Sequence, residues 1–214
     1  MSVFRTNSIE EIKDFVTFQH QLGIVERKIP QGADEFFQKL MQTSFIIAGK
    51  VTKKNVISNI KNILEDEIPE TLQNIPFFEK WIEDMANATM VFCDTQKSDS
   101  VCFWLSSERG CRRYHIDNVP LRMLITYAGK GTEWLPDKVA DRLAFVKGEP
   151  NEKIVRDPTA LQFMKAWDIA VFRGGAKGLL HRTPDDALNG PSILLRLDHP
   201  SFWDNVLKNQ YQKE

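Results

Sequence analysis

The sequence has few cysteines, few histidines and almost no net charge. Its 214 residues include three cysteines with no Cys-x-x-Cys pair, which suits a reducing compartment better than a disulfide framework. Lys and Arg number 28 against 29 Asp and Glu, so the formal charge is −1. No bulk field exists to gather nucleic acid or an anionic membrane, and a nucleic-acid partner is disfavoured. The four histidines are His20, His115, His181 and His199.

Long apolar runs are also absent. The longest, such as Cys102–Leu105 and Ile169–Phe172, have the length of a strand. A membrane-spanning helix needs about 20 apolar residues. The N-terminus shows no apolar stretch followed by the small residues of a secretory cleavage site. We therefore expect a cytoplasmic protein without a membrane partner.

The first 87 residues are expected to be helical. Ser8 and Glu11 match a capping box, and apolar residues follow at helical spacing to about Leu22. Residues 77–85 form an apolar stripe with the period of a helix. Such stripes indicate helices that pack on another layer.

After residue 87 the pattern changes to short β-branched and aromatic segments, separated by Gly, Pro, Asn and Asp. These predict strands, from residues 89–93 through 192–197. Helices followed by a mostly antiparallel sheet predict an α+β fold, with N-terminal helices packed on a jelly-roll, cupin-like double-stranded β-helix over residues 88–214. With 42% hydrophobic residues and no repeat or linker, residues 1–214 are expected to form a single domain.

One pair of segments in the β region indicates metal chemistry. His115 and Asp117 form a His-x-Asp triplet at a predicted strand, where side chains at i and i+2 share a face and can converge on one cation. Later, residues 168–184 combine an acidic turn, an apolar strand, a Gly-rich turn and a short strand that ends in His181. A strand that carries Arg196 follows.

This layout resembles the closing half of the barrel of the iron(II)- and 2-oxoglutarate-dependent dioxygenases. The resemblance implies that His115, Asp117 and His181 bind Fe(II), which leaves positions for the cosubstrate 2-oxoglutarate and oxygen. It also implies that Arg196 binds the far carboxylate of 2-oxoglutarate, with Ser192 close to it. No catalytic residue beyond the metal ligands is implied.

Alternatives stay open around this set. Arg196 lies further from His181 than is usual in that superfamily, so another arginine can take its role, or Arg196 can form a salt bridge with Asp198. Asp168 and Glu133 are candidates to orient the imidazoles. The alternative arginines are Arg122, Arg173 and Arg182.

The run from Cys111 to Pro136 resembles, more closely, a bacterial family known as domain of unknown function 1826. The resemblance rests on Arg113-Tyr-His-Ile-Asp and on Gly131-Thr-Glu-Trp-Leu-Pro. It implies that the whole chain is one family unit, whose members are associated with zinc-responsive gene neighbourhoods. Cys111 lies on the predicted face of His115 and Asp117, which also permits a zinc site.

Two functions from different classes follow. The first is an Fe(II)- and 2-oxoglutarate-dependent oxygenase that acts on a small molecule or a protein side chain. The second is a non-catalytic Zn(II)-binding protein of metal homeostasis on the same barrel. The orientation of Arg196 distinguishes them, because an arginine that binds 2-oxoglutarate must face the open metal positions. No motif names the substrate or the oligomeric state.

Overall fold

Two β-sheets form the centre of the structure. The computed structural model describes residues 3–202, and within them the strands form a sheet of seven and a sheet of three. The order in the larger sheet is β1 (Val3–Thr6), β2 (Leu22–Val25), β8 (Ile169–Arg173), β5 (Leu121–Ala128), β10 (Ile193–Asp198), β4 (Ser100–Ser106) and β3 (Ile46–Thr52). The order in the smaller sheet is β7 (Gln162–Phe163), β6 (Glu133–Leu135) and β9 (Leu180–Arg182). Paired strands are antiparallel except β1 and β2, which are parallel.

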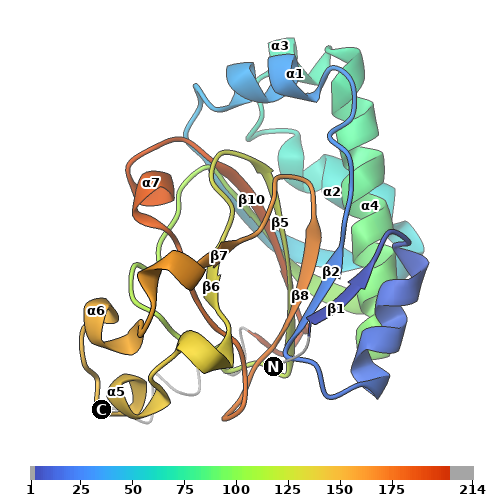
Figure 1. The fold of residues 1–214 in the computed structure, drawn as a ribbon. Coiled ribbons are helices and arrows are strands. Elements are labelled where there is room, and N and C mark those ends of the chain that lie inside the picture. Colours follow the sequence, from blue (N-terminus) through green and yellow to red (C-terminus); the bar gives the residue numbers. More distant parts are fainter. Residues whose placement is uncertain (1–2, 203–214) are drawn as a thin grey trace, which may run out of the picture.

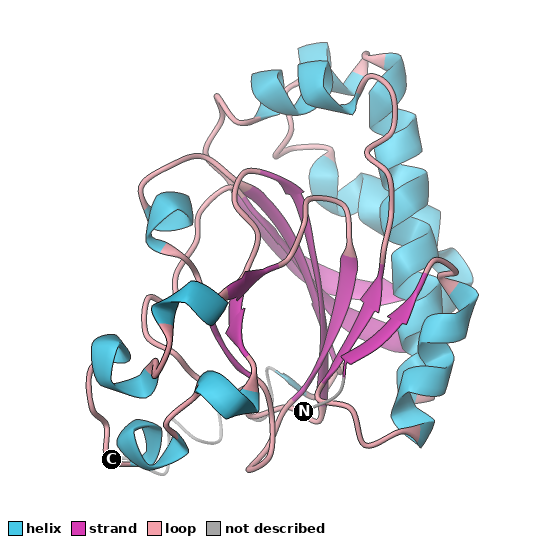
Figure 2. Cartoon of the chain, viewed as in Figure 1, coloured by secondary structure: helices cyan, strands magenta, loops and turns pink. Residues whose placement is uncertain are grey.

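The helices lie on two sides of the larger sheet (Figure 1). One side carries η1 (Glu10–Thr17), α1 (Ala33–Leu40), η2 (Lys53–Asn55), α2 (Val56–Leu64), α3 (Glu70–Gln73) and α4 (Pro76–Gln96). Beside the smaller sheet lie η3 (Asp137–Val139), α5 (Arg142–Val146), α6 (Asn151–Ile154), η4 (Pro158–Ala160) and α7 (Asp185–Leu188). The predicted α+β class is confirmed (Figure 2). Within residues 3–202, no helix combines the length and the apolar character that a membrane crossing needs.

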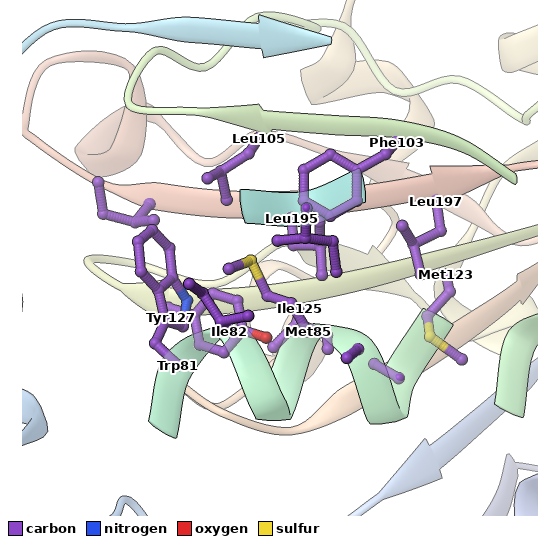
Figure 3. Close-up of a cluster of buried hydrophobic side chains, with 14 of the residues drawn as sticks. Trp81, Ile82, Met85, Phe103, Leu105, Met123, Ile125, Tyr127, Leu195 and Leu197 are labelled. Carbon is purple, nitrogen blue, oxygen red and sulfur yellow. The ribbon is translucent and has the colours of Figure 1, made fainter. Parts of the chain in front are cut away.

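The long helix α4 packs on the larger sheet. Its Trp81 and Met85 are fully buried and belong to the same core cluster as Leu195 and Leu197, with Trp81 beside Tyr127 (Figure 3). Because side chains alternate along a strand, Arg196, between these two leucines, projects to the opposite face. The alternation of β10 therefore separates the main hydrophobic core from the face that carries polar side chains.

That opposite face of the larger sheet packs in part against the smaller sheet. Leu124 from β5, Phe172 from β8 and Trp134 from β6 belong to one buried hydrophobic cluster between them. Among residues 3–202, no strand pair joins the two sheets into one hydrogen-bonded barrel. The two sheets therefore form separate layers.

The N-terminal part differs from the prediction of a purely helical segment, because it also contains β1, β2 and β3. The helix expected to reach Leu22 is the short 3-10 helix η1, which ends at Thr17. Glu11 accepts a hydrogen bond from Thr6 rather than closing a capping box with Ser8. The buried strand β2 then pairs with β1 and β8. Pairing on both sides and complete burial make residues 22–25 a strand, although the helix was expected to reach Leu22.

The predicted change at residue 87 falls inside α4. The segment 89–93, expected as a strand, is helical, and α4 ends at Gln96, where Lys97 adopts a left-handed conformation with φ of 57°. Thr89 and Phe92 continue the spacing of Trp81 and Met85 and are fully buried. Because this end of the helix is covered on several sides, it lacks the polar face that marks a helix in a sequence.

Candidate metal centre

His115 and His181 lie opposite each other in an antiparallel bridge. His115 precedes β5, and His181 is the central residue of β9. The backbone N–H of each donates to the carbonyl of the other, at N···O distances of 3.0 and 3.1 Å. Directly opposed residues of an antiparallel pair project their side chains to the same side. The two imidazole centroids are accordingly 4.3 Å apart.

Asp117 completes a compact group with these histidines, in which the ligand atoms lie within 4.8 Å of one another. Its side chain is 1% exposed, and Oδ1 accepts a hydrogen bond from Arg122 Nη1. Oδ2 is buried, has no hydrogen-bond partner among residues 3–202 and lies 3.5 Å from His181 Nε2. A buried carboxylate oxygen that lacks a partner is costly, and a cation between these side chains would satisfy it. The three residues therefore fit a divalent metal ion.

Backbone carbonyls orient both imidazoles. His115 Nδ1 lies 3.1 Å from the carbonyl of Arg113, and His181 Nδ1 lies 3.0 Å from that of Leu179. A carbonyl only accepts, so each Nδ1 must carry the proton and each Nε2 keeps its lone pair. The Nε2 atoms are also the ones nearest to Asp117, at 3.9 Å for His115 and 3.5 Å for His181. Both imidazoles thus have the tautomer and orientation of metal ligands.

The expectation that Glu133 and Asp168 orient the imidazoles is wrong. Glu133 accepts hydrogen bonds from Tyr114 and Arg182 instead. Asp168 accepts from the backbone N–H of Arg27 at 3.0 Å. The carbonyls of Arg113 and Leu179 orient the imidazoles instead. Each occupies the Nδ1 of the histidine two residues later, so no carboxylate can bind there.

Burial keeps His181 neutral. Burial lowers the pKa of His181 to about 4, with His115 and Arg122 acting in the same direction and Asp117 opposing. The ring of Phe172, with its centroid 4.7 Å from that of His181, contributes to this apolar surrounding. A metal ligand must be unprotonated, so at neutral pH no proton has to leave His181 when an ion binds.

A cavity of about 360 Å³ adjoins the histidines, within the usual range for small-ligand pockets. His115 and His181 line it, and apolar side chains from β4, β5 and β10 form part of its wall. These apolar residues are Trp104, Leu124 and Leu194. Four arginines also line the cavity, namely Arg109, Arg122, Arg182 and Arg196. The site therefore combines a metal-binding group with an apolar space that contains guanidinium groups.

Asp198 holds two of these arginines. It is 2% exposed, accepts from Arg122 Nε at 2.8 Å through Oδ1, and accepts from Arg196 Nε through Oδ2. The guanidinium of Arg196 also lies over the ring of Phe202, 4.4 Å from its centroid. Burial, followed by the charge of Arg122, lowers the pKa of Arg196. The ion pair with Asp198, an alternative that the sequence left open, is present, and Arg196 lines the cavity at the same time.

The other predicted cofactor residue, Ser192, is fully buried, and its Oγ has no hydrogen-bond partner in the described part of the chain. It packs beside Gly129 and is not among the residues that line the cavity. Arg173 donates to the carbonyls of Phe15, Phe18 and His20, away from the metal group. Arg182 forms a bidentate pair with Glu133 at 2.9 and 3.0 Å. Cys111 is exposed at the cavity and outside the compact group of ligands.

Sequence reasoning missed the role of Arg122 as the partner of Asp117. The sequence suggests Arg122 only as a substitute clamp, whereas in the structure it joins Asp117 to Asp198. A usable signal was the alternation of β10, in which Arg196 and Asp198 fall on one face of the strand. Two ionisable residues on the same face of an otherwise apolar strand predict further charged partners on the neighbouring strands.

A glycine in the β8–β9 turn fixes the backbone of Asp117. A Cβ added to Gly174 would lie 2.1 Å from the carbonyl oxygen of Val119 and 2.3 Å from that of Asp117. Gly174→Ala must therefore move the segment that carries Asp117. We expect a loss of metal affinity of about 10- to 100-fold, the range for disturbed support of a metal ligand. Co(II) binding followed by visible absorption measures it.

Gly32→Ala is the control for this substitution. Gly32 has a φ of 88°, so alanine introduces backbone strain, but it precedes α1 in the helical layer, and the nearest atom to its added Cβ belongs to Phe77, at 3.5 Å. The control should lose stability without losing Co(II) affinity. Equal Co(II) affinity in Gly174→Ala and the unchanged protein would contradict the assignment of Asp117 as a ligand.

The chain resembles one family model and several solved structures. Over residues 6–198 it matches the model of a family described as protein of unknown function DUF1826. No curated protein matches it. Similar solved structures include the Fe(II)/α-ketoglutarate-dependent dioxygenase TqaL, with 14% identity, 89% of this chain and 85% of that chain covered, and a TM-score of 0.47.

Two bacterial structures belong to the same comparison. An oxidoreductase of the 2OG-Fe(II) oxygenase family from Burkholderia pseudomallei has 12% identity, covers 92% of both chains and has a TM-score of 0.39. A prolyl-4-hydroxylase from Pseudomonas putida has 9% identity, covers 90% of this chain and 98% of that chain, and has a TM-score of 0.38. These similarities are too low to carry an argument about function, which has to come from the site.

Proposed function

The chain belongs to the DUF1826 family, and for it we propose the function of an Fe(II)- and 2-oxoglutarate-dependent oxygenase. The observation that carries the proposal is the unpartnered, buried Oδ2 of Asp117 beside the Nε2 atoms of His115 and His181. Two neutral imidazoles and one carboxylate leave further positions on iron(II) open. Iron(II) bound there would supply the oxygen chemistry, in which 2-oxoglutarate becomes succinate and CO₂ and one oxygen atom enters the substrate.

The charges beside the metal group favour a doubly negative cosubstrate. Asp117 and Asp198 contribute two negative charges and Arg122 and Arg196 two positive charges, so this ion-paired cluster is formally neutral. Iron(II) would add two positive charges to a buried site. Because buried charge is costly without compensation, a dianion such as 2-oxoglutarate would restore neutrality.

Arg196 is the residue we assign to the far carboxylate of 2-oxoglutarate. Its guanidinium lines the cavity and is oriented by Asp198 and by the ring of Phe202. A planar guanidinium binds a carboxylate with two directed hydrogen bonds, which a lysine does not provide. The role of Asp198 is then to position Arg196 while leaving part of its guanidinium for the ligand.

The apolar wall of the cavity has a separate role. Trp104 and Leu194 come from the adjacent strands β4 and β10 and line the space next to the histidines. Apolar side chains exclude water and strengthen electrostatic interactions at the site. We interpret the two facing sheets, with the ligands on the smaller sheet and its neighbouring segment, as an opened double-stranded β-helix.

The non-catalytic alternative is Zn(II) binding at the same three residues. Two histidines and one carboxylate also suit zinc. The ion pair of Arg196 with Asp198 favours this alternative to the extent that it occupies the guanidinium. In that case metal binds, but 2-oxoglutarate does not.

Turnover in the absence of a primary substrate tests the proposal. The protein is reconstituted with Fe(II) under anaerobic conditions, then given 2-oxoglutarate and oxygen, and succinate is quantified. The oxygenase proposal predicts slow, iron-dependent succinate formation and a visible charge-transfer band when 2-oxoglutarate binds anaerobically. Tight Zn(II) binding with neither succinate nor the band would overturn it in favour of the zinc protein.

Arg196→Gln should raise the KM for 2-oxoglutarate about 10- to 100-fold. A hydrogen bond to a charged group contributes about 1.5–3 kcal/mol, and 1.4 kcal/mol corresponds to tenfold. The KM of Arg196→Lys for 2-oxoglutarate should lie between those of the wild-type protein and of Arg196→Gln. Arg156→Gln removes an exposed arginine that pairs with Asp141 and serves as the control. An unchanged KM in Arg196→Gln would mean that another residue binds the far carboxylate of 2-oxoglutarate.

A further inference from the structure

Within the described residues 3–202, one arginine of the cavity differs from the others in having no carboxylate partner. Arg122 pairs with Asp117 and Asp198, Arg182 with Glu133, and Arg196 with Asp198. Arg109 donates to neutral acceptors only, to the carbonyl of Lys130 at 3.3 Å and to Thr132 Oγ1 at 3.1 Å. Among residues 3–202 no carboxylate forms an ion pair with it. Arg109 therefore brings an unbalanced positive charge to the cavity wall.

The surroundings of Arg109 hold this charge in place. Its two acceptors belong to the segment that leads into β6, so the guanidinium joins two parts of the chain. The adjacent Glu108 also lines the cavity, but its carboxylate accepts a hydrogen bond from Ser44 at 2.9 Å and, among the described residues, forms no ion pair with Arg109. Burial lowers the pKa of Arg109 to about 10. A partly desolvated cation without a counter-ion favours binding of an anion.

Arg109 and Arg196 lie toward different ends of the cavity. Arg196 pairs with Trp104 in β4, whereas Ser106, further along β4, pairs with Leu194. Arg109 donates to Lys130 and Thr132, which follow the end of β5 at Ala128, whereas Arg196 is level with Leu124, earlier in β5. The apolar side chains of Trp104, Leu124 and Leu194 line the cavity together with both arginines. A ligand that reaches Arg109 thus lies along an apolar wall.

We propose that Arg109 binds the anionic group of the primary substrate, which is a small amphipathic acid with an apolar body and one carboxylate or phosphate. The substrate assignment rests on the proposed function, because it takes the Arg196 end of the cavity as the 2-oxoglutarate site. The binding of an anion by Arg109 does not depend on turnover. The cavity volume of about 360 Å³ fits a small molecule rather than a folded partner.

Matched acids and neutral analogues test the anion site. The probes are hexanoate with hexanamide, phenylacetate with phenylacetamide, and hexyl phosphate with hexanol. Saturation-transfer NMR gives their dissociation constants for the full chain, both metal-free and with Zn(II) and 2-oxoglutarate. We expect one or both anion classes to bind about tenfold or more tightly than their neutral analogues, as a charged hydrogen bond predicts. Carboxylates and the phosphate distinguish the two classes of anion.

Arg109→Gln should reduce this preference to near unity, and Arg109→Lys should retain part of it. Arg156→Gln is again the control. The loss of 2-oxoglutarate affinity should be larger in Arg196→Gln than in Arg109→Gln. The inference is overturned if wild-type protein shows no anion preference, if Arg109→Gln retains it, or if Arg109→Gln loses as much 2-oxoglutarate affinity as Arg196→Gln.

The oxygenase proposal and the Arg109 proposal can each be overturned without the other. An Arg109-dependent anion preference in a protein that forms no succinate with Fe(II) and 2-oxoglutarate would overturn the oxygenase and leave the anion site established. Succinate formation without an Arg109-dependent preference would support the oxygenase and overturn the assignment of Arg109.

Discussion

His181→Ala is expected to abolish iron binding and, with it, succinate formation from 2-oxoglutarate. The substitution removes one of the three proposed ligands and leaves the buried Oδ2 of Asp117 without the imidazole that lies 3.5 Å away. Fe(II) affinity should fall by more than about 100-fold, because loss of mere supporting partners already costs 10- to 100-fold. Metal analysis after anaerobic reconstitution and gel filtration measures the effect.

His20→Ala is the matched control, since His20 lies among Phe4 and Phe18, outside the cavity. It should retain iron and turnover. Because His181 is 3% exposed, the thermal unfolding of His181→Ala must be measured as well. If His181→Ala does not fold, His181→Gln is used in its place. Stoichiometric iron in a folded His181→Ala protein would remove His181 from the ligand set.

Glu133→Ala should destabilise the protein by about 3–5 kcal/mol, the range for removal of one partner from a buried ion pair. Glu133 is 2% exposed, and its carboxylate accepts from Arg182 in bidentate form and from the hydroxyl of Tyr114. Its loss leaves both donors without their acceptor. Urea denaturation measures the free energy of unfolding, and Glu133→Gln should cost less because it keeps one acceptor.

Asp185→Ala provides an internal comparison on the same arginine. Asp185 pairs with Arg182 at 3.3 Å, but its side chain is 65% exposed. An exposed pair contributes at most about 1 kcal/mol. Similar losses for Glu133→Ala and Asp185→Ala would contradict the role of Glu133 as the buried partner that fixes Arg182 between Tyr114 and the cavity.

Alternation along strands made much of the β region predictable. Segments 101–105 and 121–127 are strands, and 192–197 falls on β10 with a shift of one residue, because apolar residues at every second position meet one helix-covered face. The N-terminal strand β2 was missed, since its four residues are too few to show a strand pattern and its partner β8 lies far away in the sequence. The end of α4 was missed because burial on several sides removes the polar face that marks a helix.

The grouping of His115, Asp117 and His181 was accessible from residue type and order, because a His-x-Asp triplet and a later strand histidine carry the pattern. Their orientation was not, since backbone carbonyls provide it and every residue has one. The same limit applies to Arg109. Its significance comes from the absence of a carboxylate partner among the described residues, and pairing in three dimensions cannot be read from one arginine in a loop.

The bridge between His115 and His181 gives a bound ion a mechanical consequence as well as a chemical one. An ion held by both residues would cross-link the segment before β5 to β9 and close the intervening chain, which contains β5 to β8, into a loop. Because the ion needs both residues in place, it binds the folded form and adds to the free energy of unfolding by mass action. Metal supply would thereby set the stability of the folded chain as well as its proposed chemistry.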